Sequence, residues 1–96
     1  MTIRFLAEAE TEIANAEAWY AGQMPGLEER FLADVESGLA LIEERPMAWQ
    51  PLNGNLRQFL LRKFPYGIIY RITDDGILML AVAHLHRKPG YWRDRT

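Results

Sequence analysis

Three strand-like apolar runs follow one another with only short turns between them, and this block constrains the fold more than any other stretch. The runs are residues 57–64, 68–73 and 77–85. Pro65-Tyr66-Gly67 separates the first run from the second. Asp74-Asp75-Gly76 predicts a tight hairpin, because Asp-Gly accepts the positive φ angles of such a reversal. The sequence therefore predicts an antiparallel meander, and its nearly all-apolar last strand is expected to be covered on both faces.

Two amphipathic helical patterns precede this block. Apolar residues recur every three or four positions, which places each set on one face of a helix. The two sets are Ala9, Ile13, Ala16 and Tyr20, and then Leu27, Phe31, Val35, Leu39 and Ile42. We interpret Glu8, Glu10 and Glu12 as carboxylates near the positive end of the first helix dipole. The pattern predicts a pair of helices that covers one face of the sheet.

The flanks of this helical region predict a loop and a further strand. Pro46 ends the second helix, and Pro51 and Gly54 indicate an irregular surface loop over residues 47–55. Residues 2–6 alternate as a short strand does, and we expect this strand to join the sheet because its backbone groups would otherwise be unpaired. The predicted fold is α+β in the order β-α-α-β-β-β, a helical hairpin on a mainly antiparallel sheet. We expect residues 1–96 to form one domain.

Charge is divided unevenly along the chain. The net charge is −2, but residues 1–56 carry three basic against ten acidic residues, and residues 57–96 carry eight against three. A basic second half favours an anionic partner. The alternative is that the two halves neutralise each other across the fold.

Several classes of protein are excluded or disfavoured by composition. The chain has no cysteine, which excludes disulfides, thiolate zinc sites and a cysteine nucleophile. No apolar run near the start is long enough for a signal peptide or a membrane span, so we expect a cytoplasmic protein without a membrane partner. No Gly-rich phosphate loop or metal-spaced acid motif is present, and we expect neither a cofactor nor a metal.

The residues best suited to chemistry or binding follow the last predicted strand. They are His84, His86, Arg87, Lys88, Tyr91, Trp92, Arg93 and Arg95. In an alternating strand the two histidines point the same way. Histidine, tyrosine and arginine are together able to perform acid–base chemistry on a phosphodiester. Alternatively, each histidine is a hydrogen-bonded strand-end residue, and the aromatic pair either stacks on bases or clamps the C-terminus against the core.

The layout and two strings of residues resemble the RelE/ParE superfamily of toxins from type II toxin–antitoxin modules of the plasmid-stabilisation type. The strings are FPYGIIYRI and, after the Asp-Gly hairpin, LMLAVAHLHRKPGYW, and the resemblance covers essentially the whole chain. It implies a small sheet with a helical hairpin on one face. It also implies growth arrest by the toxin and inhibition by a cognate antitoxin encoded beside it.

The superfamily contains two activities. RelE-like members cleave mRNA on the ribosome, and that resemblance implies Arg87, Tyr91, His86 and Arg62 as catalytic residues. The set is incomplete, because the position of a family arginine falls at Gly67 and those of two lysines fall near Gln58 and Leu60. An acidic pI of about 5.6 is also unfavourable for contact with ribosomal RNA.

ParE-like members poison DNA gyrase and require a binding surface without nuclease residues. That resemblance implies a target-binding segment made of Arg87, Lys88, Tyr91, Trp92, Arg93 and Arg95. We favour this interpretation, with gyrase and the antitoxin as partners. A third possibility is a non-toxic protein of the same fold that only binds an antitoxin. The sequence does not indicate an oligomeric state.

Overall fold

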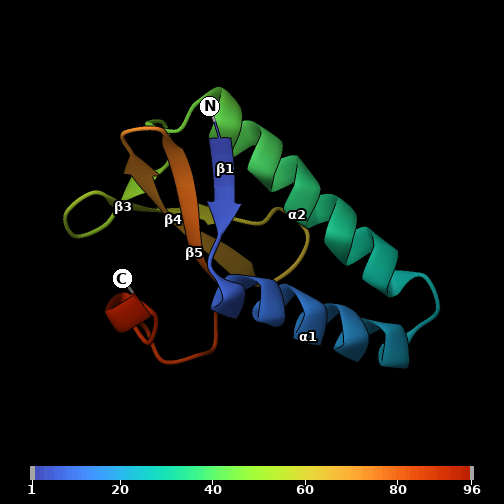
Figure 1. Cartoon of the computed structure of the whole chain (residues 1–96). Coiled ribbons are helices and arrows are strands. Elements are labelled where there is room, and N and C mark those ends of the chain that lie inside the picture. Colours follow the sequence, from blue (N-terminus) through green and yellow to red (C-terminus); the bar gives the residue numbers. More distant parts are fainter. Residues whose placement is uncertain (1, 96) are drawn as a thin grey trace.

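The computed structural model describes residues 2–95, in which a helical hairpin packs on one face of a five-stranded sheet (Figure 1). The elements are β1 (Thr2–Phe5), α1 (Ala7–Gln23), α2 (Leu27–Glu44), β2 (Gln50–Pro51), β3 (Leu56–Leu60), β4 (Tyr66–Thr73), β5 (Gly76–His84) and a 3-10 turn, η1 (Arg93–Arg95). The strand order is β1-β5-β4-β3-β2. The predicted α+β fold is confirmed. None of the helices within residues 2–95 has the length and apolar character that crossing a membrane requires.

Both helices bury the faces that the apolar spacing predicts. Ala9, Ala16 and Tyr20 of α1 and Phe31, Val35 and Ile42 of α2 are buried. The hairpin reverses at Gly26, whose φ of 86° is left-handed and is adopted readily only by glycine. At the contact between the helices, the ring centroids of Tyr20 and Phe31 lie 5.3 Å apart.

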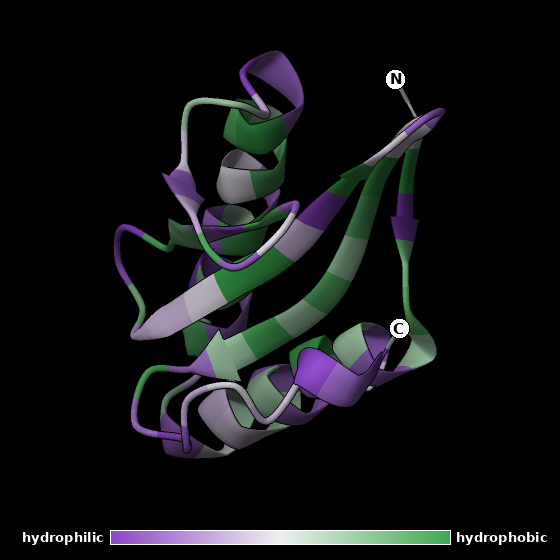
Figure 2. Cartoon of the chain, turned by 90° about the vertical axis from the view of Figure 1, so that its left-hand side faces the viewer, coloured by the Kyte–Doolittle hydropathy of each residue, from purple (hydrophilic) through white to green (hydrophobic). Residues whose placement is uncertain are grey.

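The sheet is a meander of β3, β4 and β5 to which β1 is added in parallel beside β5. Both faces of β5 are covered, as its apolar sequence predicts. Ile77, Met79 and Val82 pack in the cluster under the helices, whereas Leu80 and Ala83 belong to a second cluster on the other face. Figure 2 shows the hydrophobic colouring along these central strands.

The main differences from the sequence-based expectation lie between α2 and β4, whereas the other strand ends shift by at most one residue. The expected loop at residues 47–55 contains β2, which pairs with β3 and forms one edge of the sheet. β3 ends at Leu60 and not at Phe64, because the chain then turns so that the amides of Lys63 and Phe64 donate to the Asp34 carboxylate on α2. β4 accordingly begins at Tyr66.

The predicted hairpin between β4 and β5 forms, but the role of its glycine is different. No described residue of the Asp74-Asp75-Gly76 turn has a positive φ. Instead, a Cβ on Gly76 would lie 1.9 Å from the Thr2 carbonyl oxygen. Gly76 is therefore required by the close approach of β1 to the start of β5.

Candidate functional site

The candidate site is the C-terminal segment, residues 85–95, which leaves β5 and returns across the sheet face that the helices do not cover (Figure 1). The Leu85 amide donates to the Pro65 carbonyl at 2.9 Å, where the segment leaves the sheet. Gly90, with φ 82°, then reverses the chain toward η1. The Trp92 side chain is only 6% exposed and packs with Ile69 and Leu80, which fixes the end of the segment on the sheet.

One carboxylate on α1 accepts hydrogen bonds from the side chains of this segment. Glu12 Oε2 accepts a hydrogen bond from the Tyr91 hydroxyl at 2.6 Å and from Arg95 Nη2 at 2.9 Å. Glu12 Oε1 accepts from Arg95 Nη1 at 3.0 Å and from the Val82 amide at 2.9 Å. The Arg95 guanidinium thus makes a bidentate pair with a carboxylate that is 13% exposed. We refer to Glu12, Tyr91 and Arg95 as the Glu12 cluster.

The Glu12 cluster also completes the edge of β5 where β1 ends. β1 pairs with β5 only as far as Met79, whose carbonyl accepts the Leu6 amide at 3.0 Å. Beyond that point, Glu12 accepts the Val82 amide and Arg95 Nη1 donates to the Leu80 carbonyl at 2.9 Å. Two side chains therefore satisfy backbone groups that a longer β1 would have paired.

Ionisation in the cluster follows from these contacts. Burial alone raises the pKa of Glu12, but the hydrogen bonds from Arg95, Tyr91 and the Val82 amide outweigh burial and lower this pKa below its ordinary value. Burial, together with the bond to Glu12, raises the pKa of Tyr91 to about 12. The carboxylate therefore stays charged and the phenol stays protonated at neutral pH.

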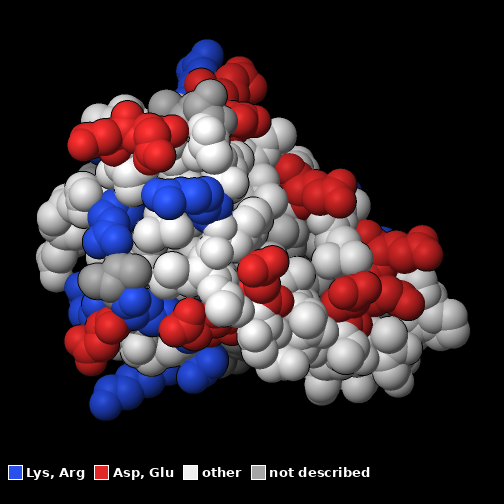
Figure 3. Space-filling view, viewed as in Figure 1, with Lys and Arg blue, Asp and Glu red and all other residues white. Residues whose placement is uncertain are grey.

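Three cations of the segment remain exposed: Arg87, Lys88 and Arg93. The Arg87 guanidinium lies 3.7 Å above the centroid of the Tyr91 ring and 3.8 Å from Glu12. Arg93 lies 5.1 Å from the Trp92 ring. Figure 3 shows basic side chains gathered on the side of the sheet and of this segment, whereas acidic side chains predominate over the helices.

The two halves of the chain also neutralise each other in part. Each ion pair found within residues 2–95 joins an early residue to a late one: Arg4 to Asp75, and Glu12 to Arg87 and Arg95. Lys88 and Arg93 take part in none of these pairs, so the segment keeps net positive charge at its surface.

Two hollows of the described surface bring His84 together with Arg87 and Tyr91, but His86 and Arg62 line neither of them, so the implied nuclease set is not assembled. His84 and His86 lie on the same side, with ring centroids 5.1 Å apart, and His84 Nδ1 accepts the His86 amide at 3.1 Å. Arg62 lines a different groove, beside α2. At Gly67 an added Cβ would lie 2.8 Å from Gln58 Nε2, so this position has no room for a larger side chain unless Gln58 moves.

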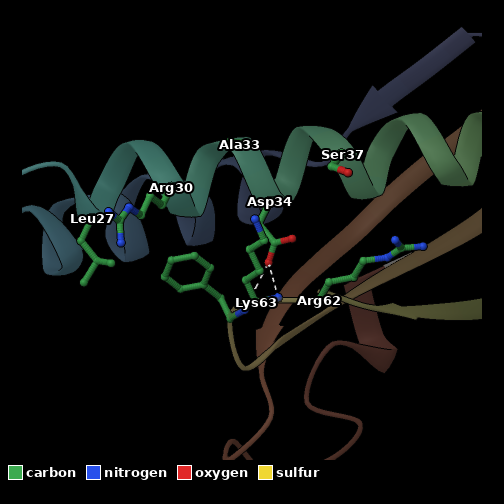
Figure 4. A pocket seen from close by; sticks show the side chains of 8 residues that line it. Leu27, Arg30, Ala33, Asp34, Ser37, Arg62 and Lys63 are labelled. Atoms are coloured by element: carbon green, nitrogen blue, oxygen red, sulfur yellow. Dashed lines mark hydrogen bonds between the residues drawn. The ribbon is translucent and has the colours of Figure 1, made fainter.

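A groove beside α2 has a volume of about 720 Å³ (Figure 4). It is lined by Leu27, Arg30, Ala33, Asp34, Ser37, Arg62, Lys63 and Phe64. The buried Asp34 carboxylate accepts hydrogen bonds from the Lys63 and Phe64 backbone amides at 2.8 and 3.2 Å. The three basic side chains therefore give the groove a net positive charge. Within residues 2–95, no cluster of acidic residues and histidines suited to a metal ion is found.

Glu12 is the site residue that the sequence-based interpretation missed. Its place in the first turns of α1, beside Glu8 and Glu10, favours an interaction with the helix dipole instead. A signal was present, because Glu12 lies three positions after Ala9 and four before Ala16, on the edge of the apolar stripe. A carboxylate placed there requires a cationic or hydrogen-bonding partner from another element.

Comparison with known proteins identifies the family of this chain. Residues 3–89 match the family described as ParE toxin of type II toxin–antitoxin system, parDE. Two proteins named Toxin ParE2, from Mycobacterium tuberculosis strains CDC 1551 / Oshkosh and ATCC 25618 / H37Rv, are each 33% identical over 81 residues, which cover 83% of this chain and 77% of theirs. The solved structure titled "Chromosomal ParDE TA system from P. aeruginosa" matches with a TM-score of 0.78 over 90% of this chain and 97% of that chain. At 14% identity, this likeness concerns the fold alone.

Proposed function

This chain belongs to the ParE family of toxins of type II toxin–antitoxin systems, and we propose that it arrests growth by binding and poisoning DNA gyrase in the cytoplasm. The whole chain, residues 1–96, acts as one toxin domain. The contact with gyrase is made by the C-terminal segment through Arg87, Lys88 and Arg93. Tyr91, Trp92 and Arg95 hold these cations in place.

The hydrogen bond and the protonation of Tyr91 are the observations that favour gyrase over mRNA as the target. Its phenol donates to Glu12, and its pKa is raised to about 12, so it does not act as a base near neutral pH. Arg62 lines the groove beside α2, whereas Arg87 lies on the C-terminal segment. A binding surface requires neither acid–base pairing nor convergence of these groups.

We further propose that the cognate antitoxin docks in the groove beside α2. Arg30, Arg62 and Lys63 lie around this groove, and none of them belongs to an ion pair identified within residues 2–95. Leu27 and Phe64 add apolar surface. An antitoxin segment with acidic and apolar side chains complements both features.

Two triple variants with equal change of charge test both assignments. The first is Arg87→Ala, Lys88→Ala and Arg93→Ala, and the second is Arg30→Ala, Arg62→Ala and Lys63→Ala. Each purified protein is assayed for inhibition of gyrase supercoiling with accumulation of cleaved DNA. Each is also assayed for binding to the protein encoded beside it.

The variant of Arg87, Lys88 and Arg93 is expected to lose gyrase poisoning and to keep antitoxin binding. The variant of Arg30, Arg62 and Lys63 is expected to keep gyrase poisoning and to lose antitoxin binding. Wild-type protein that cleaves ribosome-bound mRNA and leaves gyrase unaffected would overturn the gyrase assignment. Wild-type protein that leaves both gyrase and ribosome-bound mRNA unaffected and does not arrest growth would support the non-toxic alternative.

A further inference from the structure

Few backbone hydrogen bonds join the C-terminal segment to the rest of the fold. After the bond from Leu85 to Pro65, its backbone hydrogen bonds are local and join Arg87 to His84, Arg93 to Gly90 and Arg95 to Trp92. Its attachment to the sheet and to α1 is therefore made by side chains.

Two kinds of side-chain contact provide this attachment. Trp92 supplies the apolar one, in the cluster with Leu80 and Ala81. Packing of one ring fixes where the segment lies but leaves the direction of its neighbours weakly defined. Glu12 supplies the polar one, through the directional hydrogen bonds of Tyr91 and Arg95.

The polar contacts lie next to two of the exposed cations, Arg87 and Arg93. Tyr91 and Arg95 stand on either side of Arg93 in sequence, and the Tyr91 ring supports the Arg87 guanidinium at 3.7 Å. Glu12 Oε2 itself lies 3.8 Å from Arg87 Nη1. The Glu12 carboxylate therefore orients the side chains of this surface. It lies beneath them and does not itself face a binding partner.

We propose that Glu12 is a positioning residue for target binding: by holding Tyr91 and Arg95 it fixes the directions of Arg87 and Arg93 before the target arrives. This inference rests on the proposed function of the C-terminal segment. Ordering these side chains in the free protein removes an entropy cost that would otherwise oppose association. The raised Tyr91 pKa and the lowered Glu12 pKa are consistent with a cluster that keeps its charges and bonds at neutral pH.

The test uses substitutions that change the cluster but leave the exposed cations intact. Glu12→Gln removes the charge of the carboxylate, and Tyr91→Phe removes one bond but keeps the ring under Arg87. Glu10→Gln is the matched control, because Glu10 is an exposed acid on the same helix. Ile42→Val is the stability control, because it weakens the core under α2 without touching the segment.

Three quantities are measured for each folded protein: hydrogen exchange of the amides of residues 86–95, the dissociation constant for gyrase, and growth arrest on expression. Glu12→Gln is expected to speed exchange in the segment and to weaken gyrase binding by roughly tenfold. Tyr91→Phe is expected to have a smaller effect of the same sign. Glu10→Gln and Ile42→Val are expected to keep wild-type affinity.

The outcomes separate this inference from the proposed function. If wild-type protein binds gyrase and folded Glu12→Gln binds it equally well, positioning by Glu12 is overturned and the gyrase assignment stands. If Ile42→Val loses as much affinity as Glu12→Gln, the effect is one of stability and the inference fails. If wild-type protein does not bind gyrase, the gyrase assignment fails. Growth arrest then decides: arrest unchanged by Glu12→Gln overturns the inference, and weakened arrest supports it for whichever target is bound.

Discussion

The Tyr91 hydroxyl donates a 2.6 Å hydrogen bond to the carboxylate of Glu12, which lies 79 positions earlier in the chain. Both side chains are partly buried, and Arg95 completes the group with a bidentate ion pair to Glu12. This relationship joins the first helix to the last segment of the chain. One acidic side chain on α1 thus holds two residues of the C-terminal segment.

Replacing Glu12 by glutamine is expected to lower the free energy of unfolding by about 2 kcal/mol, because Arg95 then stays in a mostly buried site without a countercharge. Urea denaturation followed by circular dichroism measures this difference. Glu10→Gln, an exposed change on the same helix, is expected to stay within about 0.5 kcal/mol of wild type. Equal unfolding midpoints for the two variants would contradict the structural role of Glu12.

The stabilisation by Glu12 is expected to depend on pH. The folded state lowers the pKa of Glu12 below 4.5, its value in an unfolded chain, despite the opposing effect of burial. The contribution is therefore fully present above about pH 4.5 and is lost as the pH falls through the folded-state pKa. We expect the difference in unfolding free energy between wild type and Glu12→Gln to shrink below this pH. A difference that stays constant down to the acid transition would show that Glu12 does not titrate in this way.

Tyr91 is expected to ionise late in alkali. Burial, followed by the bond to Glu12, raises its pKa from 10.0 to about 12 in the folded protein. Folded stability from this phenol is thus complete below about pH 10 and is lost as the pH rises toward 12. Ultraviolet titration of phenolate in wild type and Tyr91→Phe measures the ionisation of this side chain by difference. A difference curve centred near pH 10 would contradict the buried hydrogen bond.

Asp34 is expected to stabilise the turn between β3 and β4. Asp34→Ala leaves the Lys63 and Phe64 amides without their acceptor, and we expect a loss of about 1–3 kcal/mol in unfolding free energy. Hydrogen exchange at these two amides should accelerate in the same variant. Glu36→Ala, at an exposed position of α2, serves as the control. Unchanged protection at both amides would exclude this role.

Gly76 is expected to be intolerant of alanine. The added methyl group would lie 1.9 Å from the Thr2 carbonyl oxygen, so β1 has to move away from β5. We expect a loss of about 1–3 kcal/mol in unfolding free energy and faster hydrogen exchange in β1. Gly22→Ala, in open space near the end of α1, is expected to gain about 0.5–1 kcal/mol. Retained protection in β1 of Gly76→Ala would contradict the close approach.

The helices and the three-stranded meander were predictable because their periodicity is local. Phe31, Val35 and Ile42 are buried as their spacing requires, and β5 is covered on both faces as its apolar run requires. β2 was not predictable, because two residues containing a proline carry no strand signal and form a ladder only where β3 offers one.

The candidate site was predictable in position but not in organisation. The sequence placed the cations after β5, where the structure has them. It did not distinguish the exposed Arg93 from Arg95, which pairs with Glu12, because this distinction depends on the return of the chain at Gly90. An ion pair between a helix acid and a distant C-terminal arginine produces no periodic pattern in the sequence. Such a pair therefore cannot be inferred from local spacing.

The parallel pairing of β1 with β5 has a consequence for the order of synthesis. β1 is synthesised before its partner, Gly76–His84, which follows only after both helices and the other strands. The bond from Arg95 to Glu12 spans 83 positions and forms later still. During translation the residues of the helical hairpin are therefore complete before those of the sheet on which it packs. The basic surface therefore takes its final shape only after residues 85–95 have been made and Arg95 has paired with Glu12.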